Sequence, residues 1–167
     1  DSLQKRLAAH TIHKLSKSTK WQPAIASTEM SADVNEFYLF HGTSLDMAKV
    51  ICEHGFDERM ANLTGLYGAG SYFAINACKS HQYSAAKKES SNFVMLVCRV
   101  TMGSPYCTSG QHPHERRPPE NVATPGRPFD SIFAEAGIAK GGQQNHNEYV
   151  VFDRCQVYPE YVVHYRV

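Results

Sequence analysis

Short apolar runs separated by polar and glycine-rich stretches follow one another along the chain from residue 37 onward. The longest of them, at 93–97 and 149–152, have the length of strands and fall far short of the roughly 20 apolar residues that span a bilayer. No membrane association is therefore expected. The pattern predicts strands at 37–40, 71–75, 93–101, 129–133, 148–153 and 161–167, with a further short strand within 155–158.

Two segments carry the start and stop signals of helices. In the first, Thr43 and Asp46 have the spacing of a capping box, and Gly55 is a natural C-terminal stop. The second helix is predicted over residues 76–88, with Asn76 as its N-cap. Residues 1–20 place leucine and isoleucine among basic residues, which indicates a short basic amphipathic helix or a linker.

Strands outnumber helices in this prediction, and the runs around Val151 and Val162 lie too close together to have a helix between them. This order favours an antiparallel or mixed α+β domain over a regularly alternating parallel one. The glycine-rich run at 65–70 lacks the G-x-G-x-x-G order and precedes a predicted strand, so it does not indicate a dinucleotide-binding parallel fold. Residues 103–129 are rich in glycine, proline, histidine and serine and are expected to be mostly loop.

The composition is that of one folded domain. The chain has 167 residues, of which 42% are hydrophobic and 20% are charged, and its formal net charge is +1. This balance gives no general attraction for nucleic acid or for a membrane surface, so neither is expected as a partner. Any partner must be recognised by a specific site.

The five cysteines are scattered and contain no C-x-x-C pair. An odd number without close pairs argues against a disulfide framework and favours a reducing, intracellular compartment. Cys107, His112 and His114 lie in one loop and come nearest to a metal site. Because they have no evident fourth ligand, a structural role is favoured for them and no metal is expected.

Three segments far apart in the chain carry candidate chemistry. The first, LFHGTS at 39–44, puts a histidine and a glycine at the end of an apolar strand, which suits a planar ligand that pairs with the main chain. The second, YGAGSYFA at 67–74 with KSHQY at 79–83, supplies Tyr72 and Tyr83, which can enclose an aromatic ring. The third, NEYVVFD at 147–153, begins a strand with Glu148, either in solvent or at the edge of a cleft. Taken singly, such features are more often structural than functional.

Taken together, the three segments resemble the catalytic domain of the poly(ADP-ribose) polymerase family, and within it the tankyrases most closely. The resemblance covers residues 37–167 and includes HGFDER at 54–59, GAGSYFA at 68–74, and EYVVFD with YPEY within 148–161. It implies the split antiparallel β-sheet ADP-ribosyltransferase fold, which is an α+β fold with flanking helices. It also divides the chain into an N-terminal helix or linker at 1–36 and a catalytic domain at 37–167.

The resemblance further implies that NAD⁺ is the substrate, and it assigns roles to particular residues. Glu148 accepts a hydrogen bond from the nicotinamide ribose and stabilises the developing cation, while His41 binds the adenosine ribose. Gly42 and Ser80 bind the nicotinamide amide, and Tyr83 stacks on the cationic ring with Tyr72 on its other side. The implied catalytic set is His41, Tyr72 and Glu148, and the implied NAD⁺-binding residues are His41, Gly42, Thr43, Tyr72, Lys79, Ser80 and Tyr83.

The implied activity is transfer of ADP-ribose from NAD⁺ to protein acceptors with release of nicotinamide, a glycosyltransferase reaction that requires no metal. A glutamate at position 148 favours extension into a polymer over mono-ADP-ribosylation. Two alternatives stay open: an NAD⁺ glycohydrolase, in which water is the acceptor, and a non-catalytic module that binds NAD⁺ or ADP-ribose. The glycohydrolase would use the same residues. Loss of His41 or Glu148 would mark the binding module, and both are present.

Overall fold

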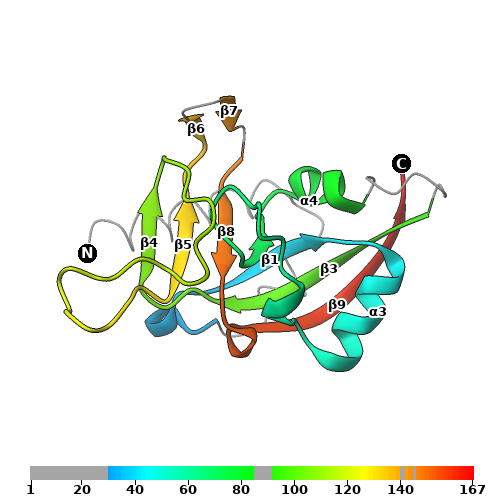
Figure 1. The fold of residues 1–167 in the computed structure, drawn as a ribbon. Coiled ribbons are helices and arrows are strands. Elements are labelled where there is room, and N and C mark those ends of the chain that lie inside the picture. Colours follow the sequence, from blue (N-terminus) through cyan, green and yellow to red (C-terminus); the bar gives the residue numbers. More distant parts are fainter. Residues whose placement is uncertain (1–29, 85–91, 140–141, 145) are drawn as a thin grey trace.

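A computed structural model describes residues 30–84, 92–139, 142–144 and 146–167. One sheet has the order β1-β3-β9 and is antiparallel throughout. Its strands are β1 (Glu36–Gly42), β3 (Asn92–Thr101) and β9 (Val157–Arg166). Figure 1 shows this sheet beside a second one, with helix α3 next to β3 and β9 and helix α4 above β1.

The second sheet has the order β2-β8-β5-β4. β8 pairs antiparallel with both β2 and β5, whereas β4 and β5 are parallel, so the sheet is mixed. Its strands are β2 (Ser71–Phe73), β4 (Pro105–Thr108), β5 (Ser131–Ala134) and β8 (Glu148–Val151). A small hairpin of β6 (Gly137–Ala139) and β7 (Gly142–Gln144) lies between β5 and β8 in the chain.

The two sheets meet where β1 ends. The main chains of Phe40 and Ala74 exchange hydrogen bonds of 2.8 and 3.0 Å and form an isolated bridge between the sheets. This arrangement of two sheets and flanking helices confirms the α+β prediction. It also places the end of β1 next to β2, so that residues more than 30 positions apart can share one site.

β2 and β8 end two residues earlier than predicted, and β1 and β3 differ from the prediction by one or two residues. Three other strands depart from the prediction more clearly. β4 lies inside the stretch expected to be loop; Pro105 is its first residue, a position that tolerates proline because the missing N–H is not needed in the ladder. β5 begins two residues later than expected, at Ser131. β9 is one long strand where two short ones were expected, and it keeps pairing with β3 through a register shift between Val97 and Cys98.

Helix α3 (Leu45–His54) begins one residue later than the predicted cap at Thr43 implies. Its N-cap is Ser44, whose hydroxyl accepts a 3.3 Å hydrogen bond from the Met47 amide, so the predicted capping role of Thr43 was wrong. The predicted stop is confirmed: Gly55 has φ +78° and its N–H donates to the Ile51 carbonyl. The other elements are α4 (Ala77–Ser84) and the short 3₁₀ turns η1 (Ala32–Val34), η2 (Glu58–Met60) and η3 (Arg154–Gln156).

Part of the prediction lies outside the described residues. This holds for the basic N-terminal helix at 1–20 and for the C-terminal end of the helix predicted at 76–88. Within the described part of the chain, no helix has both the length and the apolar character needed to cross a bilayer.

The main core lies between the two sheets and α3. It is built from side chains on one face of β1 and β3, including Leu39 and Leu96, which are fully buried, together with Phe133 and Tyr149 from the second sheet. A smaller cluster centres on the fully buried Tyr67 and packs against Ile132, Ala134 and Val150. Tyr72, Tyr106 and Phe152 complete its edge.

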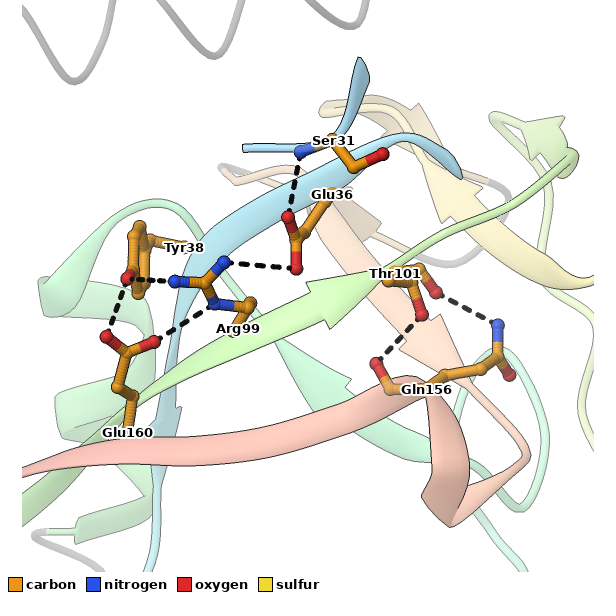
Figure 2. Close-up of polar contacts among 7 residues, drawn as sticks. All are labelled: Ser31, Glu36, Tyr38, Arg99, Thr101, Gln156 and Glu160. Atoms are coloured by element: carbon orange, nitrogen blue, oxygen red, sulfur yellow. Dashed lines mark hydrogen bonds and ion pairs between the residues drawn. The ribbon is translucent and has the colours of Figure 1, made fainter. Parts of the chain in front are cut away.

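A polar network ties the three strands of the first sheet together on the face away from the main core (Figure 2). The Arg99 guanidinium donates to Glu160 at 3.1 Å and to the Tyr38 hydroxyl at 3.0 Å, and it lies 3.5 Å from Glu36. The Tyr38 hydroxyl in turn donates to Glu160 at 2.8 Å. These contacts raise the pKa of Arg99 above its ordinary value, with the Glu160 hydrogen bond as the largest cause, so this charge is permanent.

Candidate active site

A cavity of about 800 Å³ opens between the end of β1, the loop after α3, and helix α4. Its volume lies in the range of sites that enclose small organic ligands, about 300–1,000 Å³. The structure brings together every residue that was predicted to act on NAD⁺. The residues of this set that line the cavity are His41, Gly42, Thr43, Tyr72, Lys79, Ser80, Tyr83 and Glu148.

His41 stands at the end of β1, with its ring packed against Phe56 and Phe73. Its Nδ1 lies 2.9 Å from the Tyr72 carbonyl oxygen. Because a carbonyl can only accept, Nδ1 carries the proton. Burial lowers the pKa of His41, and the hydrogen bond to Tyr72 offsets this only in part. The imidazole is therefore neutral near pH 7, which leaves Nε2 as a hydrogen-bond acceptor.

Tyr72 is held by its hydroxyl as well as by its ring. The hydroxyl accepts from the Tyr67 amide at 2.9 Å and donates to the Gly68 carbonyl at 2.8 Å. Burial is the largest cause that raises the pKa of Tyr72 above its ordinary value, so the hydroxyl stays protonated. A side chain on Gly65 would collide with this hydroxyl. Tyr72 therefore presents a fixed aromatic wall and is not available as an acid or base.

Helix α4 packs against the end of β1 at Gly42 and Ser80. A Cβ on Gly42 would collide with the Ser80 carbonyl, so only glycine permits this close approach. The Ser80 side chain is buried, and its hydroxyl donates to the Phe40 carbonyl at 2.9 Å. In this state Ser80 can accept a hydrogen bond, and donation to a ligand requires its hydroxyl to rotate away from Phe40.

Glu148 is the first residue of β8 and is 3% exposed. It lines the cavity, so the cleft-edge interpretation of this position fits better than the solvated one. Lys79 Nζ lies 3.1 Å from Glu148 Oε1, and the two side chains are 17% and 4% exposed. Burial is the largest single influence on the pKa of Lys79 and lowers it. The charges and hydrogen bonds of Glu148 and Tyr83 together outweigh burial, so the pKa is raised above its ordinary value. Lys79 is therefore a stable cation beside a buried carboxylate.

Tyr83 and Thr43 complete the predicted set at the mouth of the cavity. The Tyr83 side chain is 52% exposed, and Lys79 Nζ lies 5.5 Å from the centre of its ring. An aromatic side chain half exposed at a cavity mouth can stack on a planar ligand without an internal rearrangement. Thr43 is partly exposed and follows the last residue of β1.

The apolar outer wall of the cavity was missed by the sequence analysis. It consists of Met47 and Val50 from α3 together with Met60 and Leu66 from the following loop. Three of these are large apolar side chains left between 46% and 68% exposed: Val50, Met60 and Leu66. Apolar residues on the outer side of an otherwise amphipathic helix were the signal that could have identified it.

A second feature that the sequence analysis missed is a pair of hydrogen bonds that hold the two residues before β8. The Asn76 side chain lies 2.9 Å from His146 Nδ1, and Asn147 Oδ1 accepts a 2.8 Å hydrogen bond from the Ala136 amide. These contacts join the start of α4 to the residues that precede Glu148. Within the described residues, no group of three His, Cys, Asp or Glu side chains is placed to hold a metal ion.

Comparison with known proteins gives the class and then the family. The α+β fold of two sheets with flanking helices is consistent with the class of ADP-ribosyltransferase domains. The family model described as "Poly(ADP-ribose) polymerase catalytic domain" matches residues 4–167, and the chain belongs to this family.

Among curated proteins, the chain is similar to PARP12 and PARP11, each of which is named protein mono-ADP-ribosyltransferase. It is 36% identical to mouse PARP12 over 134 residues, which is 80% of the chain and 17% of that protein. Human PARP12 is 35% identical over 133 residues, covering 79% of the chain and 17% of that protein. Human PARP11 is 28% identical over 149 residues, covering 78% and 41%. The chain thus spans about one sixth of the length of PARP12, and the closer likeness to tankyrases stays a prediction.

Proposed function

We propose that this domain transfers a single ADP-ribose unit from NAD⁺ to a side chain of a protein acceptor and releases nicotinamide. The observation that carries the proposal is the convergence of eight predicted residues on one cavity, around a buried carboxylate held by a lysine. The names of the relatives, PARP12 and PARP11, support single-unit transfer.

The nicotinamide end of NAD⁺ would lie between Tyr72 and Tyr83, with its amide at the Gly42 main chain beside Ser80. A cationic ring is favoured by aromatic faces, typically by about 0.5–2 kcal/mol, and this preference weakens when neutral nicotinamide leaves. The Nε2 atom of His41 would accept a hydrogen bond from a ribose hydroxyl, which positions NAD⁺ without contact with the bond that breaks.

Glu148 would act where the charge changes. As the C–N bond to nicotinamide breaks, its electron pair leaves with nicotinamide and the ribose gains positive charge. A carboxylate that accepts a hydrogen bond from the ribose 2′-hydroxyl stabilises that charge. The acceptor then forms the new bond to the ribose C1′ and gives up its proton. Lys79, whose Nζ lies 3.1 Å from Oε1, holds the Glu148 side chain in place for this task.

Polymer formation was favoured by the sequence because of Glu148, and the named relatives favour the single-unit product instead. Incubation with labelled NAD⁺ followed by gel separation tests this directly. We expect one shifted band; a ladder would establish elongation, and free ADP-ribose alone would establish the glycohydrolase.

Substitution Glu148→Gln tests the residue at the centre of the proposal. We expect nicotinamide release to fall by about 10²–10³-fold, the usual loss when one stabilising group is removed, while NAD⁺ binding by calorimetry survives. Glu53→Gln, an exposed residue on α3, is the matched control and should match the unmodified protein. Turnover unchanged in Glu148→Gln would refute the assignment.

A further inference from the structure

A loop that lies outside the cavity is docked onto the turn that precedes β2. The His112 amide donates to the Leu66 carbonyl at 2.8 Å, and the Ala69 amide donates to the Glu115 carbonyl at 2.8 Å. Between these two bonds, Gly68 has φ +91° and approaches the Glu115 main chain so closely that a side chain on it would collide there. Residues 112–115 and 66–69 therefore form one docked unit.

The same turn is the one that holds Tyr72. The Tyr67 amide and the Gly68 carbonyl bind the two sides of the Tyr72 hydroxyl, at 2.9 and 2.8 Å. The main-chain carbonyl of Tyr72 then binds His41 Nδ1 at 2.9 Å. A displacement of the turn would thus move the aromatic wall of the cavity and the imidazole beside it.

His112 anchors the docked loop to β4. Its ring meets the Tyr106 ring edge-on, with centroids 5.1 Å apart, and its Nε2 lies 3.1 Å from Thr108 Oγ1. Tyr106 packs against the same Tyr67-centred cluster as Tyr72. The imidazole of His112 therefore fixes the residue on β4, and the main-chain amide of the same residue binds the turn at Leu66.

We propose that His112 is a positioning residue for the NAD⁺ site: it docks the loop after β4 onto the turn that holds Tyr72. The inference rests on the proposed function, because it concerns the same cavity. Glu148 and Lys79 lie on β8 and α4, whereas the hydrogen bonds given above for residues 112–115 go to the turn at 66–69 and to Thr108. Loss of His112 should consequently weaken ligand binding and leave the chemical step largely intact.

The test compares His112→Ala with Gln111→Ala, an exposed neighbour in the same loop. For His112→Ala we expect the affinity of benzamide to fall and KM for NAD⁺ to rise, each by about threefold to tenfold, the effect of losing one or two hydrogen bonds. The kcat for nicotinamide release should stay within about twofold. Gln111→Ala should match the unmodified protein in all three measurements. Thr108→Val, which removes the hydroxyl that His112 contacts, serves as the second variant if His112→Ala does not fold.

A double-mutant cycle with Tyr72→Phe separates positioning from general destabilisation. If His112 acts through the Tyr72 hydroxyl, His112→Ala should add no further loss of benzamide affinity in the Tyr72→Phe background. The same fold-loss in both backgrounds, or a lower melting temperature with unchanged KM and benzamide affinity, would overturn the inference. If the unmodified protein itself neither binds benzamide nor releases nicotinamide, the proposed function fails first, and the two failures are distinguishable.

Discussion

Replacement of Lys79 by methionine removes the only charge that the structure places against the Glu148 carboxylate among the described residues. At the observed separation of 3.1 Å, two unit charges in an environment of effective dielectric about 20 attract by ~5 kcal/mol before desolvation is subtracted. The Lys79 side chain is 17% exposed, so water screens part of the attraction that the substitution removes. A net cost of about 2 kcal/mol, within the range of a hydrogen bond to a charged group, corresponds to about 30-fold in kcat/KM.

The rate should fall because Glu148 loses the ion pair that fixes its side chain, and a carboxylate displaced from the ribose stabilises the developing cation less well. Lys79→Arg keeps the charge and should recover most of the activity at pH 8.

Nicotinamide release measured at pH 8 over a range of NAD⁺ concentrations checks this prediction. Lys49→Met is the matched control, because Lys49 is an exposed lysine on α3 that lies 4.0 Å from Asp46 and does not line the cavity. A kcat/KM for Lys79→Met within threefold of the unmodified protein would refute the reasoning.

Three further predictions follow from the contacts of individual residues. Gly42→Ala should abolish benzamide binding measured by calorimetry, because the new Cβ meets the Ser80 carbonyl; retained affinity would contradict the close approach. Tyr83→Ala should weaken benzamide by about threefold to tenfold, since a stacked aromatic pair contributes about 0.5–1.5 kcal/mol, and unchanged affinity would exclude stacking. The hydrogen bonds from Arg59 lower the pKa of Asp57 to about 2. These hydrogen bonds therefore stabilise the folded state fully above pH 3.8, and this stabilisation is lost as the pH falls through about 2. An NMR titration of the Asp57 carboxyl should show this midpoint and its return toward 3.8 in Arg59→Ala; an ordinary midpoint in the unmodified protein would contradict it.

The sequence predicted the strands with strong apolar runs and missed those without them. β1, β3 and β8 were predicted because each buries several consecutive residues between two packed layers. β4 was missed because it starts with Pro105 and its other three residues are only partly buried, as in a loop. Its pairing with β5 is parallel and joins residues about 26 positions apart in the chain. The long β9 was divided in two because Pro159 interrupts its pattern; only the paired β3 shows that the strand continues.

The residues of the site were predictable by their resemblance to a family, whereas their supports were not. His41, Tyr72 and Glu148 lie in motifs that read continuously along the chain. The groups that hold the site in place are main-chain groups and distant side chains. Examples are the Tyr67 amide, which binds the Tyr72 hydroxyl, and Asn76, which contacts His146 two residues before Glu148. No periodicity in a single sequence marks a main-chain carbonyl as a partner. The same limit explains the misplaced helix cap, since Thr43 and Ser44 offer the same hydroxyl one residue apart.

The site is divided between two sheets, which the main-chain bridge between Phe40 and Ala74 joins, and this division affects how variants of the domain will behave. His41 belongs to one sheet and Glu148 to the other, and their separation is set by the packing of the layer in between. A volume change at Phe133, deep in that layer, shifts one half of the molecule against the other and will appear in an assay as a loss of activity at temperatures where the fold is still intact. Inherited or engineered changes in this interior should therefore be scored by turnover, because thermal stability alone will classify some inactive proteins as sound.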